Sequence, residues 1–111
     1  MTNTYYDKVF RVTKLIPLGR VTNYGAIADF LALGSARMVG WALNKCAHLE
    51  IPAHRVVNSK GELSGRNQFP HPELMAQLLQ NEGIEIRDHK VINFKDVFWH
   101  PGWDLNQEDF L

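Results

Sequence analysis

The segment TNYGAIADFLALGSARMVGWALNK, residues 22–45, contains two short stretches with helical periodicity. The first predicted helix spans residues 24–31, and Thr22 is predicted as its N-cap. A glycine then breaks the pattern, and Ser35 is the predicted N-cap of a second helix over about 36–45. Two short helices around a glycine-containing turn match the helix-turn-helix pattern, so the segment predicts that motif.

The second predicted helix has two contrasting faces. One face carries Ala36, Val39, Ala42 and Leu43. The other carries Arg37, Gly40, Trp41 and Asn44, which share the i, i+3, i+4, i+7 spacing of a single helix face. In a helix-turn-helix, an arginine in the first turn and a glycine that permits close approach suit contact with DNA. Trp41 has two interpretations, contact with DNA and packing in the core.

Two further helices are predicted outside this segment. Residues 6–16 show apolar spacing near the helical period, and the sequence PLG at 17–19 ends that element. Residues 71–83 form another predicted helix, with Pro72 at its start and Gly83 just past its end. The residues expected to face inward on it are Leu74, Met75, Leu78 and Leu79.

Strand signals are short. HRVVNSKGEL, residues 54–63, has a β-branched pair followed by turn residues, and it predicts a small β-hairpin. Residues 84–103 are ambiguous between strand and loop, and residues 104–111 are expected to form an exposed acidic tail. The expected fold is therefore mainly α with a small β-hairpin, in one domain over residues 1–111.

Composition excludes several classes of protein. No apolar run approaches the length of a membrane helix, and no signal peptide opens the chain, so no membrane partner is expected. Cys46 is the single cysteine, which excludes an internal disulfide and suits a reducing cytoplasm. Cys46, His48 and His54 do not form a familiar zinc spacing, so neither a metal nor another cofactor is predicted.

Charge is balanced overall but not along the chain. Residues 1–66 hold nine Lys/Arg against four Asp/Glu, a net charge of +5, whereas residues 67–111 hold three against eight, a net charge of −5. The first half is therefore suited to a polyanion that the second half would repel. Chance differences between halves of a small domain explain the same numbers, and charge alone does not decide between the two.

The segment IPAHRVV, residues 51–57, has the surroundings of a reactive site without a reactive centre. A nucleophilic site needs a nucleophile, a histidine that takes its proton and an acid that orients the histidine. His54 and Glu82 supply the last two groups. The residue beside His54 is Ala53, whose methyl group cannot attack.

Four segments resemble motifs of the O6-alkylguanine-DNA alkyltransferases, in the family's order and spacing. They are GRVTNYGAIA (19–28), SARMVGWAL (35–43), IPAHRVV (51–57) and LLQNEG (78–83). The third resembles the family's Pro-Cys-His-Arg-Val signature, with Ala53 in place of the cysteine that accepts the alkyl group. The resemblance covers most of residues 5–86, and it implies a winged-helix-like domain with a helix-turn-helix at about 22–45.

Loss of the acceptor cysteine is typical of the alkyltransferase-like proteins. That resemblance implies a protein, not an enzyme, that binds O6-alkylguanine in double-stranded DNA and leaves the alkyl group in place. It further implies base flipping from the minor groove, a monomer, and partner proteins of nucleotide excision repair. Many members carry tryptophan at the position of Ala53, so alanine is a departure that should leave more room for bulky adducts.

Residue roles follow from the same resemblance. Arg37 matches the arginine that inserts into the base stack; the alternative is a surface salt bridge with Asp29 or Glu50. Tyr24 matches the tyrosine that helps rotate the target phosphate and lines the base pocket. The loop 51–66 would complete that pocket. The pocket residues expected from it are Pro52, Ala53, Ser64, Gly65 and Arg66.

His54 and Glu82 match the pair that activates the cysteine in the enzymes. Without a thiol they are expected to persist as a structural hydrogen-bonded pair, with no catalytic residue in the chain. Arg55 and Asn44 are expected to brace the loop that carries residues 52–55.

Other interpretations remain at this stage. Cys46 would be the nucleophile of an active alkyltransferase, or the helix-turn-helix would belong to a sequence-specific transcription regulator. The aromatic residues Trp99, Trp103 and Phe110 either close the core or form a docking surface.

Overall fold

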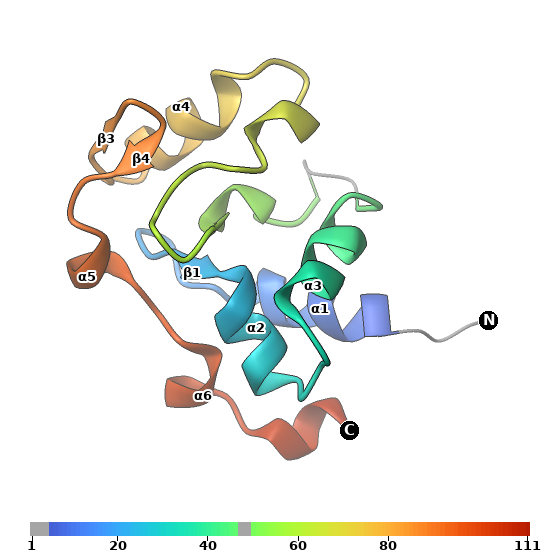
Figure 1. Cartoon of the computed structure of the whole chain (residues 1–111). Coiled ribbons are helices and arrows are strands. Elements are labelled where there is room, and N and C mark those ends of the chain that lie inside the picture. Colours follow the sequence, from blue (N-terminus) through green and yellow to red (C-terminus); the bar gives the residue numbers. More distant parts are fainter. Residues whose placement is uncertain (1–4, 47–49) are drawn as a thin grey trace.

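The computed structural model describes residues 5–46 and 50–111, and it is mainly helical (Figure 1). The α-helices are α1 (Tyr5–Lys14), α2 (Tyr24–Phe30), α3 (Ala36–Leu43), α4 (Leu74–Asn81), α5 (Phe94–Val97) and α6 (Pro101–Asp104). Short 3₁₀ turns are η1 (Ala53–Arg55), η2 (Arg66–Gln68) and η3 (Gln107–Phe110). The strands are β1 (Thr22–Asn23), β2 (Val56–Val57), β3 (Ile86–Arg87) and β4 (Lys90–Val91). The expected fold class is confirmed.

Helices α2 and α3 form the predicted helix-turn-helix; they pack against each other, and α3 also packs against α1 (Figure 1). Asn23, and not Thr22, is the N-cap of α2, because its Oδ1 accepts a hydrogen bond of 2.7 Å from the amide of Ala26. Thr22 is instead buried in β1. Ser35 occupies the predicted N-cap position of α3, although its side chain makes no capping hydrogen bond.

The inner face of α3 is close to the prediction. Val39, Ala42 and Leu43 are buried in the core, whereas Ala36 in the first turn is exposed. Trp41 is 52% exposed on the opposite face. Its interpretation as a core residue is therefore wrong, because the helix turns the indole away from α1 and α2.

The predicted hairpin over residues 54–63 is wrong. Asn58 does begin a turn, since its Oδ1 accepts from the amides of Lys60 and Glu62. Strand β2, however, pairs in parallel with β1. The antiparallel hairpin is β3–β4, whose turn residues Asp88 and His89 both have positive φ. The two valines of β2 are buried. Pairing with β1, which is distant in sequence, places β2 in the core, whereas a local hairpin would leave it closer to the surface.

Helix α4 follows the prediction with a later start. Met75 and Leu79 are fully buried, and Leu74 and Leu78 pack partly buried against the core. Gly83 follows the helix with φ of +88°, the left-handed conformation that favours glycine at this position. None of the helices in the described ranges has the length and apolar character needed to cross a membrane.

The C-terminal segment returns beside α2 and is not a loose tail (Figure 1). Phe110 is buried; its ring packs edge-on against Phe30 at 5.4 Å, and the Arg11 guanidinium lies 4.7 Å from its centre. Gln107 also donates to the Phe30 carbonyl. Most of residues 104–111 are exposed as expected, and the one buried residue among them, Phe110, anchors the segment to the core.

Candidate nucleic-acid interface

The outer face of α3 bears an open depression of about 360 Å³. The four residues predicted to contact DNA all line it, together with two neighbours: Tyr24, Ala36, Arg37, Gly40, Trp41 and Asn44. A Cβ placed on Gly40 would meet nothing within 4 Å. Glycine is therefore not required there by the fold itself, and it leaves the helix backbone accessible to a partner molecule.

Arg37 is exposed at the start of α3. Within residues 5–46 and 50–111 it makes no ion pair with Asp29 or Glu50, so the salt-bridge alternative is wrong. The guanidinium is thus available to a ligand. A planar guanidinium can stack in a gap between bases.

A second, enclosed cavity of about 20 Å³ lies directly behind the depression. Its lining residues come from α2, α3, η1, β2, η2 and α4 and from positions next to them: Tyr24, Gly40, Leu43, Asn44, Ala53, Val56, Gly65, Gln68, Phe69 and Met75. Tyr24, Gly40 and Asn44 line both hollows, so the two are neighbours. The volume suffices for about one water molecule and not for a base.

The predicted lesion pocket is thus only partly assembled. Tyr24, Ala53 and Gly65 line the enclosed cavity, whereas Pro52, Ser64 and Arg66 do not. Sequence reasoning missed Gln68, Phe69 and Met75. Nothing in the local pattern of these three residues distinguishes a cavity wall from ordinary core, because their position depends on how the chain after Gly65 folds back.

Tyr24 and the loop that carries Gly65 are in close contact. A Cβ on Gly65 would lie 2.9 Å from the Tyr24 hydroxyl, closer than real contacts allow, so any larger residue there would force the hydroxyl to move. Ser64 hydrogen-bonds the same hydroxyl. Burial raises the pKa of Tyr24 more than this hydrogen bond lowers it. The phenol is therefore a neutral hydrogen-bonding group on the wall shared by both hollows.

His54 and Glu82 form the predicted hydrogen-bonded pair, with Nε2 and Oε2 2.7 Å apart. Arg55 joins them, since its Nε and Nη2 donate to the Glu82 carboxylate at 2.9–3.1 Å. The Gly19 amide donates to Oε1 at 2.9 Å, and Arg55 Nη1 donates to the Ile16 carbonyl at 2.8 Å. Glu82 therefore connects the chain after α1 to η1, the turn that carries Ala53.

The protonation states of this network follow from its surroundings. Burial lowers the pKa of His54, outweighing the opposite effect of Glu82. Burial acts to raise the pKa of Glu82, but Arg55, the Gly19 amide and His54 together hold it below its ordinary value. Near neutral pH, Glu82 is consequently ionised and His54 is neutral, with its Nε2 proton donated to the carboxylate.

Of the two residues predicted to brace the 52–55 loop, Arg55 does so and Asn44 does not. Arg55 acts as expected through Glu82 and Ile16. The Asn44 side chain makes no hydrogen bond within the described part of the chain, so its predicted bracing role is wrong; it lines the two hollows instead.

Cys46 does not have the surroundings of a nucleophile. Its Sγ donates to the Leu43 carbonyl at 3.0 Å. Burial raises the pKa of the thiol more than a hydrogen bond with the backbone of Cys46 itself lowers it. A reactive cysteine needs a lowered pKa, so this thiol is poorly suited to the displaced-nucleophile alternative. His48 lies outside the described residues; within them, no three His, Cys, Asp or Glu side chains gather as a metal site would require.

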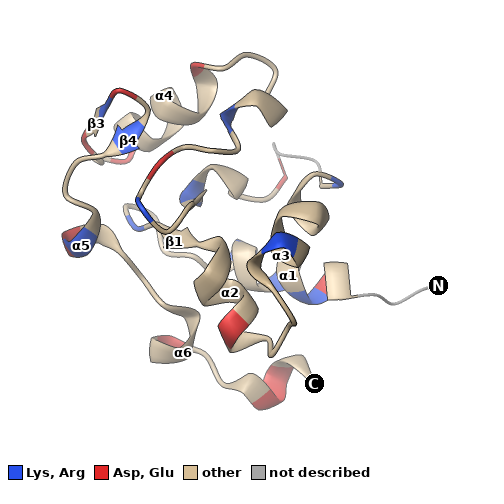
Figure 2. Cartoon of the chain, viewed as in Figure 1, with Lys and Arg blue, Asp and Glu red and all other residues tan. Residues whose placement is uncertain are grey.

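Charge separates along the molecule. Figure 2 shows basic residues on α3 and on the loop before α4, and acidic residues on α2, on α6 and in the C-terminal turn. No ion pair within the described residues joins Arg37 to an acidic residue of 67–111. A polyanion would approach α3 and be repelled at the C-terminal segment.

Comparison with known proteins identifies relatives along most of the chain. Residues 4–84 match the family model of the 6-O-methylguanine DNA methyltransferase DNA-binding domain. The alkyltransferase-like protein 1 of Schizosaccharomyces pombe is 36% identical over 104 residues, which cover 87% of this chain and 95% of that protein. The DNA base-flipping protein of Vibrio parahaemolyticus is 36% identical over 98 residues, covering 85% and 94%.

Solved structures agree with these sequence matches. The Schizosaccharomyces pombe Atl1 complex with damaged DNA containing O6-carboxymethylguanine superposes with a TM-score of 0.76 at 31% identity, covering 88% of this chain and 98% of that one. The Mycobacterium tuberculosis OGT complex with DNA gives 0.63 at 32% identity, covering 74% of this chain and 51% of the other. The second protein is thus about twice as long as the part it shares.

Proposed function

Since this chain belongs to the family of the 6-O-methylguanine DNA methyltransferase DNA-binding domain, we propose that it is a non-enzymatic sensor of O6-alkylguanine in double-stranded DNA. One observation carries the proposal: the buried methyl group of Ala53 lines the enclosed cavity where the family's enzymes need a nucleophile. The same cavity adjoins the exposed DNA face of α3. A base bound there after the cavity has widened would meet Ala53 and no nucleophile that could accept its alkyl group.

Recognition begins when α3 enters the minor groove of the DNA. Direct sequence readout is poor in that groove, which suits a search for lesions at any sequence. Gly40 lets the helix backbone come close, and Trp41 packs its exposed indole against the DNA beside Arg37. Extruding the target nucleotide costs a few kcal/mol of stacking. The Arg37 guanidinium offsets part of that cost by stacking in the vacated space.

The extruded base then occupies the position of the enclosed cavity, which widens to admit it. Tyr24 directs the target phosphate and lines the cavity together with Ala53 and Gly65. Backbone amides at Ser64 and Gly65 bind the base edge. Arg66 has a weaker part, because its Nη1 already donates to the Leu63 carbonyl at 3.1 Å.

Ala53 favours a broad range of adducts. A methyl group at this position leaves space that an indole would fill, so bulky O6-alkyl groups should be bound as well as small ones. Affinities for duplexes with O6-methylguanine and O6-benzylguanine measure this directly. A sharp preference for the methyl adduct would contradict the role given to Ala53.

A protein that binds a lesion without repairing it depends on other proteins to remove the lesion. We propose that the bound monomer marks the site for nucleotide excision repair in the cytoplasm. The support is the resemblance to alkyltransferase-like proteins together with the absence of a nucleophile at Ala53.

The decisive experiment is a competition assay with two duplexes of identical sequence, one of which contains O6-methylguanine. We expect the protein to prefer the modified duplex and Arg37→Ala to lose most of that preference. Arg87→Ala, which removes an exposed arginine from the β3–β4 hairpin, is the matched control and should discriminate normally. Equal affinity for both duplexes would instead support a transcription regulator.

A labelled methyl group on the duplex tests the enzymatic alternative. The label should remain on DNA after long incubation with excess protein. Transfer to the protein would overturn the proposal and point to Cys46.

A further inference from the structure

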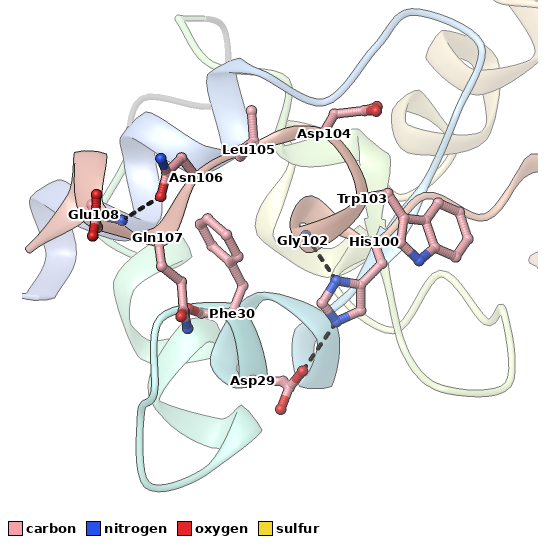
Figure 3. A pocket seen from close by; sticks show the side chains of 10 residues that line it. All are labelled: Asp29, Phe30, His100, Gly102, Trp103, Asp104, Leu105, Asn106, Gln107 and Glu108. Carbon is pink, nitrogen blue, oxygen red and sulfur yellow. Dashed lines mark hydrogen bonds and ion pairs between the residues drawn. The ribbon is translucent and has the colours of Figure 1, made fainter.

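An open groove of about 750 Å³ lies between α2 and the C-terminal segment α6–η3 (Figure 3). Figure 3 shows Phe30 on its floor, His100 and Trp103 on one side, and Asn106 and Glu108 on the other. None of its lining residues belongs to either hollow at α3. The groove is thus a surface that the proposed DNA interface does not use, and its volume lies within the roughly 300–1,000 Å³ of ligand sites.

The groove carries unneutralised negative charge. Asp29, Asp104 and Glu108 line it, and no Lys or Arg is among the described residues that do so. Asp29 faces His100 Nε2 at 3.1 Å but is 78% exposed, and Asp104 accepts from the Trp99 indole at 2.7 Å. The Glu108 carboxylate has no partner within residues 5–46 and 50–111, so it remains available to an incoming cation.

An exposed aromatic ring borders these carboxylates. Trp103 is 62% exposed, whereas Trp99 and Phe110 are buried. Of these three aromatic residues, only Trp103 is therefore free for docking. Its indole is fixed by an edge-on contact with Phe98 at 5.7 Å. The backbone that carries it is fixed as well, because the Gly102 amide donates to His100 Nδ1 at 2.9 Å.

Together these features define the chemistry of a partner. A guanidinium or ammonium group binds the face of an indole and is attracted to nearby carboxylates at the same time. DNA is excluded from the groove because its phosphates would meet three carboxylates. Charge complementarity of this kind selects partners and speeds their association.

We propose that this groove binds a basic, arginine- or lysine-containing segment of a partner protein while the face of α3 remains open to DNA. The inference goes beyond the proposed lesion-sensing function and does not depend on it. A groove on the C-terminal segment allows one small chain to hold DNA and a second protein on separate surfaces.

The test is an NMR titration of the ¹⁵N-labelled, DNA-free protein with the peptide Gly-Arg-Gly-Lys-Gly-Arg-Gly-Ser. We expect shifts of the Trp103 indole signal and of the amides of residues 102–108. Binding should weaken as salt rises from about 0.05 to about 0.3 M, since exposed charges are screened. The same peptide with every Arg and Lys replaced by Glu should cause no shifts. Because DNA is absent, failure here leaves the lesion-binding experiment unaffected.

Variants make the test specific. Glu108→Lys should weaken peptide binding at least about fivefold by reversing one charge. Trp103→Ala should weaken it about threefold through loss of the indole face. Asp96→Lys, an equal charge reversal on α5 outside the groove, is the control and should bind the peptide normally. If Trp103→Ala fails to fold, Glu108→Lys still decides the matter, because its side chain is exposed and makes no contact that the fold needs.

Three results would overturn the inference. One is that the shifts concentrate on residues 36–44 and not on the groove. Another is that Asp96→Lys weakens binding as much as Glu108→Lys. The third is that the groove signals move with protein concentration alone, which would show that a second copy of the chain occupies it.

Discussion

Replacing Glu82 by glutamine should be among the most destabilising isosteric changes in the chain. The carboxylate is 10% exposed, and it accepts hydrogen bonds from Gly19, His54 and Arg55. A glutamine offers one acceptor oxygen, turns its NH₂ group toward these donors and leaves the Arg55 charge without its partner. Breaking a buried ion pair from one side costs about 3–5 kcal/mol, and glutamine's retained oxygen places the cost near about 3 kcal/mol.

The corresponding change in melting temperature follows from chain length. An unfolding entropy of about 2.1 cal/mol/K per residue gives about 0.23 kcal/mol/K for this chain. A loss of about 3 kcal/mol therefore lowers Tm by roughly 13 °C. Thermal unfolding followed by circular dichroism at pH 7.5 measures it. The control is Glu85→Gln, an equal change at an exposed position three residues away, which should shift Tm by about 1–2 °C at most.

The dependence on pH gives this prediction a second check. Because the pKa of Glu82 is lowered in the folded protein, its contribution is present at neutral pH and is lost as the pH falls through that folded value. The gap in Tm between the parent and Glu82→Gln should accordingly close in acid. Two results would refute the assignment of Glu82 as the connection between the chain after α1 and η1. One is a decrease in Tm of less than about 4 °C for Glu82→Gln at pH 7.5, and the other is a difference in Tm that stays constant down to pH 3.

Three further outcomes follow from the site. Gly40→Ala should raise the stability of α3 by up to about 1 kcal/mol, because its Cβ meets no atom, yet it should weaken DNA binding in an anisotropy assay. Gly65→Ala should displace the Tyr24 hydroxyl and reduce lesion preference severalfold in the competition assay, since 2.9 Å is too close for both groups; unchanged preference would exclude Tyr24 as a pocket wall. Burial lowers the pKa of His54, so the unfolded chain binds a proton first and stability should fall as the pH drops below about 6.5. Urea unfolding between pH 8 and pH 5 measures this last effect, and a rise in stability toward pH 5 would contradict it.

Local physical rules were enough to predict helices α1 to α4, whereas α5 and most of α6 lie in residues 84–103, which were ambiguous between strand and loop. The apolar spacing of residues 24–31 and 36–45 and the breaker between them predict α2 and α3 because these signals act within a few residues. Local signals were not enough to identify the N-cap of α2, because that choice depends on strand pairing. Thr22 and Asn23 are adjacent and both can cap, and pairing of β1 with β2 assigns Thr22 to the strand.

Non-local contacts account for the errors. Val56 and Val57 have the composition of a hairpin strand, but their partner precedes them by more than thirty residues, beyond the reach of any turn signal. The same limit applies to Phe69 and Met75, which reach the cavity only through the path of the chain after Gly65. Trp41 shows the reverse case. Its helical spacing placed it correctly on the outer face, while its aromatic character suggested the core.

The small size of the enclosed cavity divides the site into a fixed part and an adaptable part. A space of about 20 Å³ cannot hold a guanine, so binding requires one wall to yield. The α3 wall is anchored by buried Val39 and Ala42, and the Ala53 wall is held through the Glu82 network. The backbone hydrogen bonds of η2, from Arg66 to Leu63 and from Gln68 to Gly65, are local. Within the described residues, no backbone hydrogen bond therefore ties residues 64–68 to another element, and Ser64 is linked to Tyr24 through its side chain. We therefore expect the DNA-facing side to stay rigid while this short segment adjusts to adducts of different size, which is how a pocket without chemistry can accept many lesions.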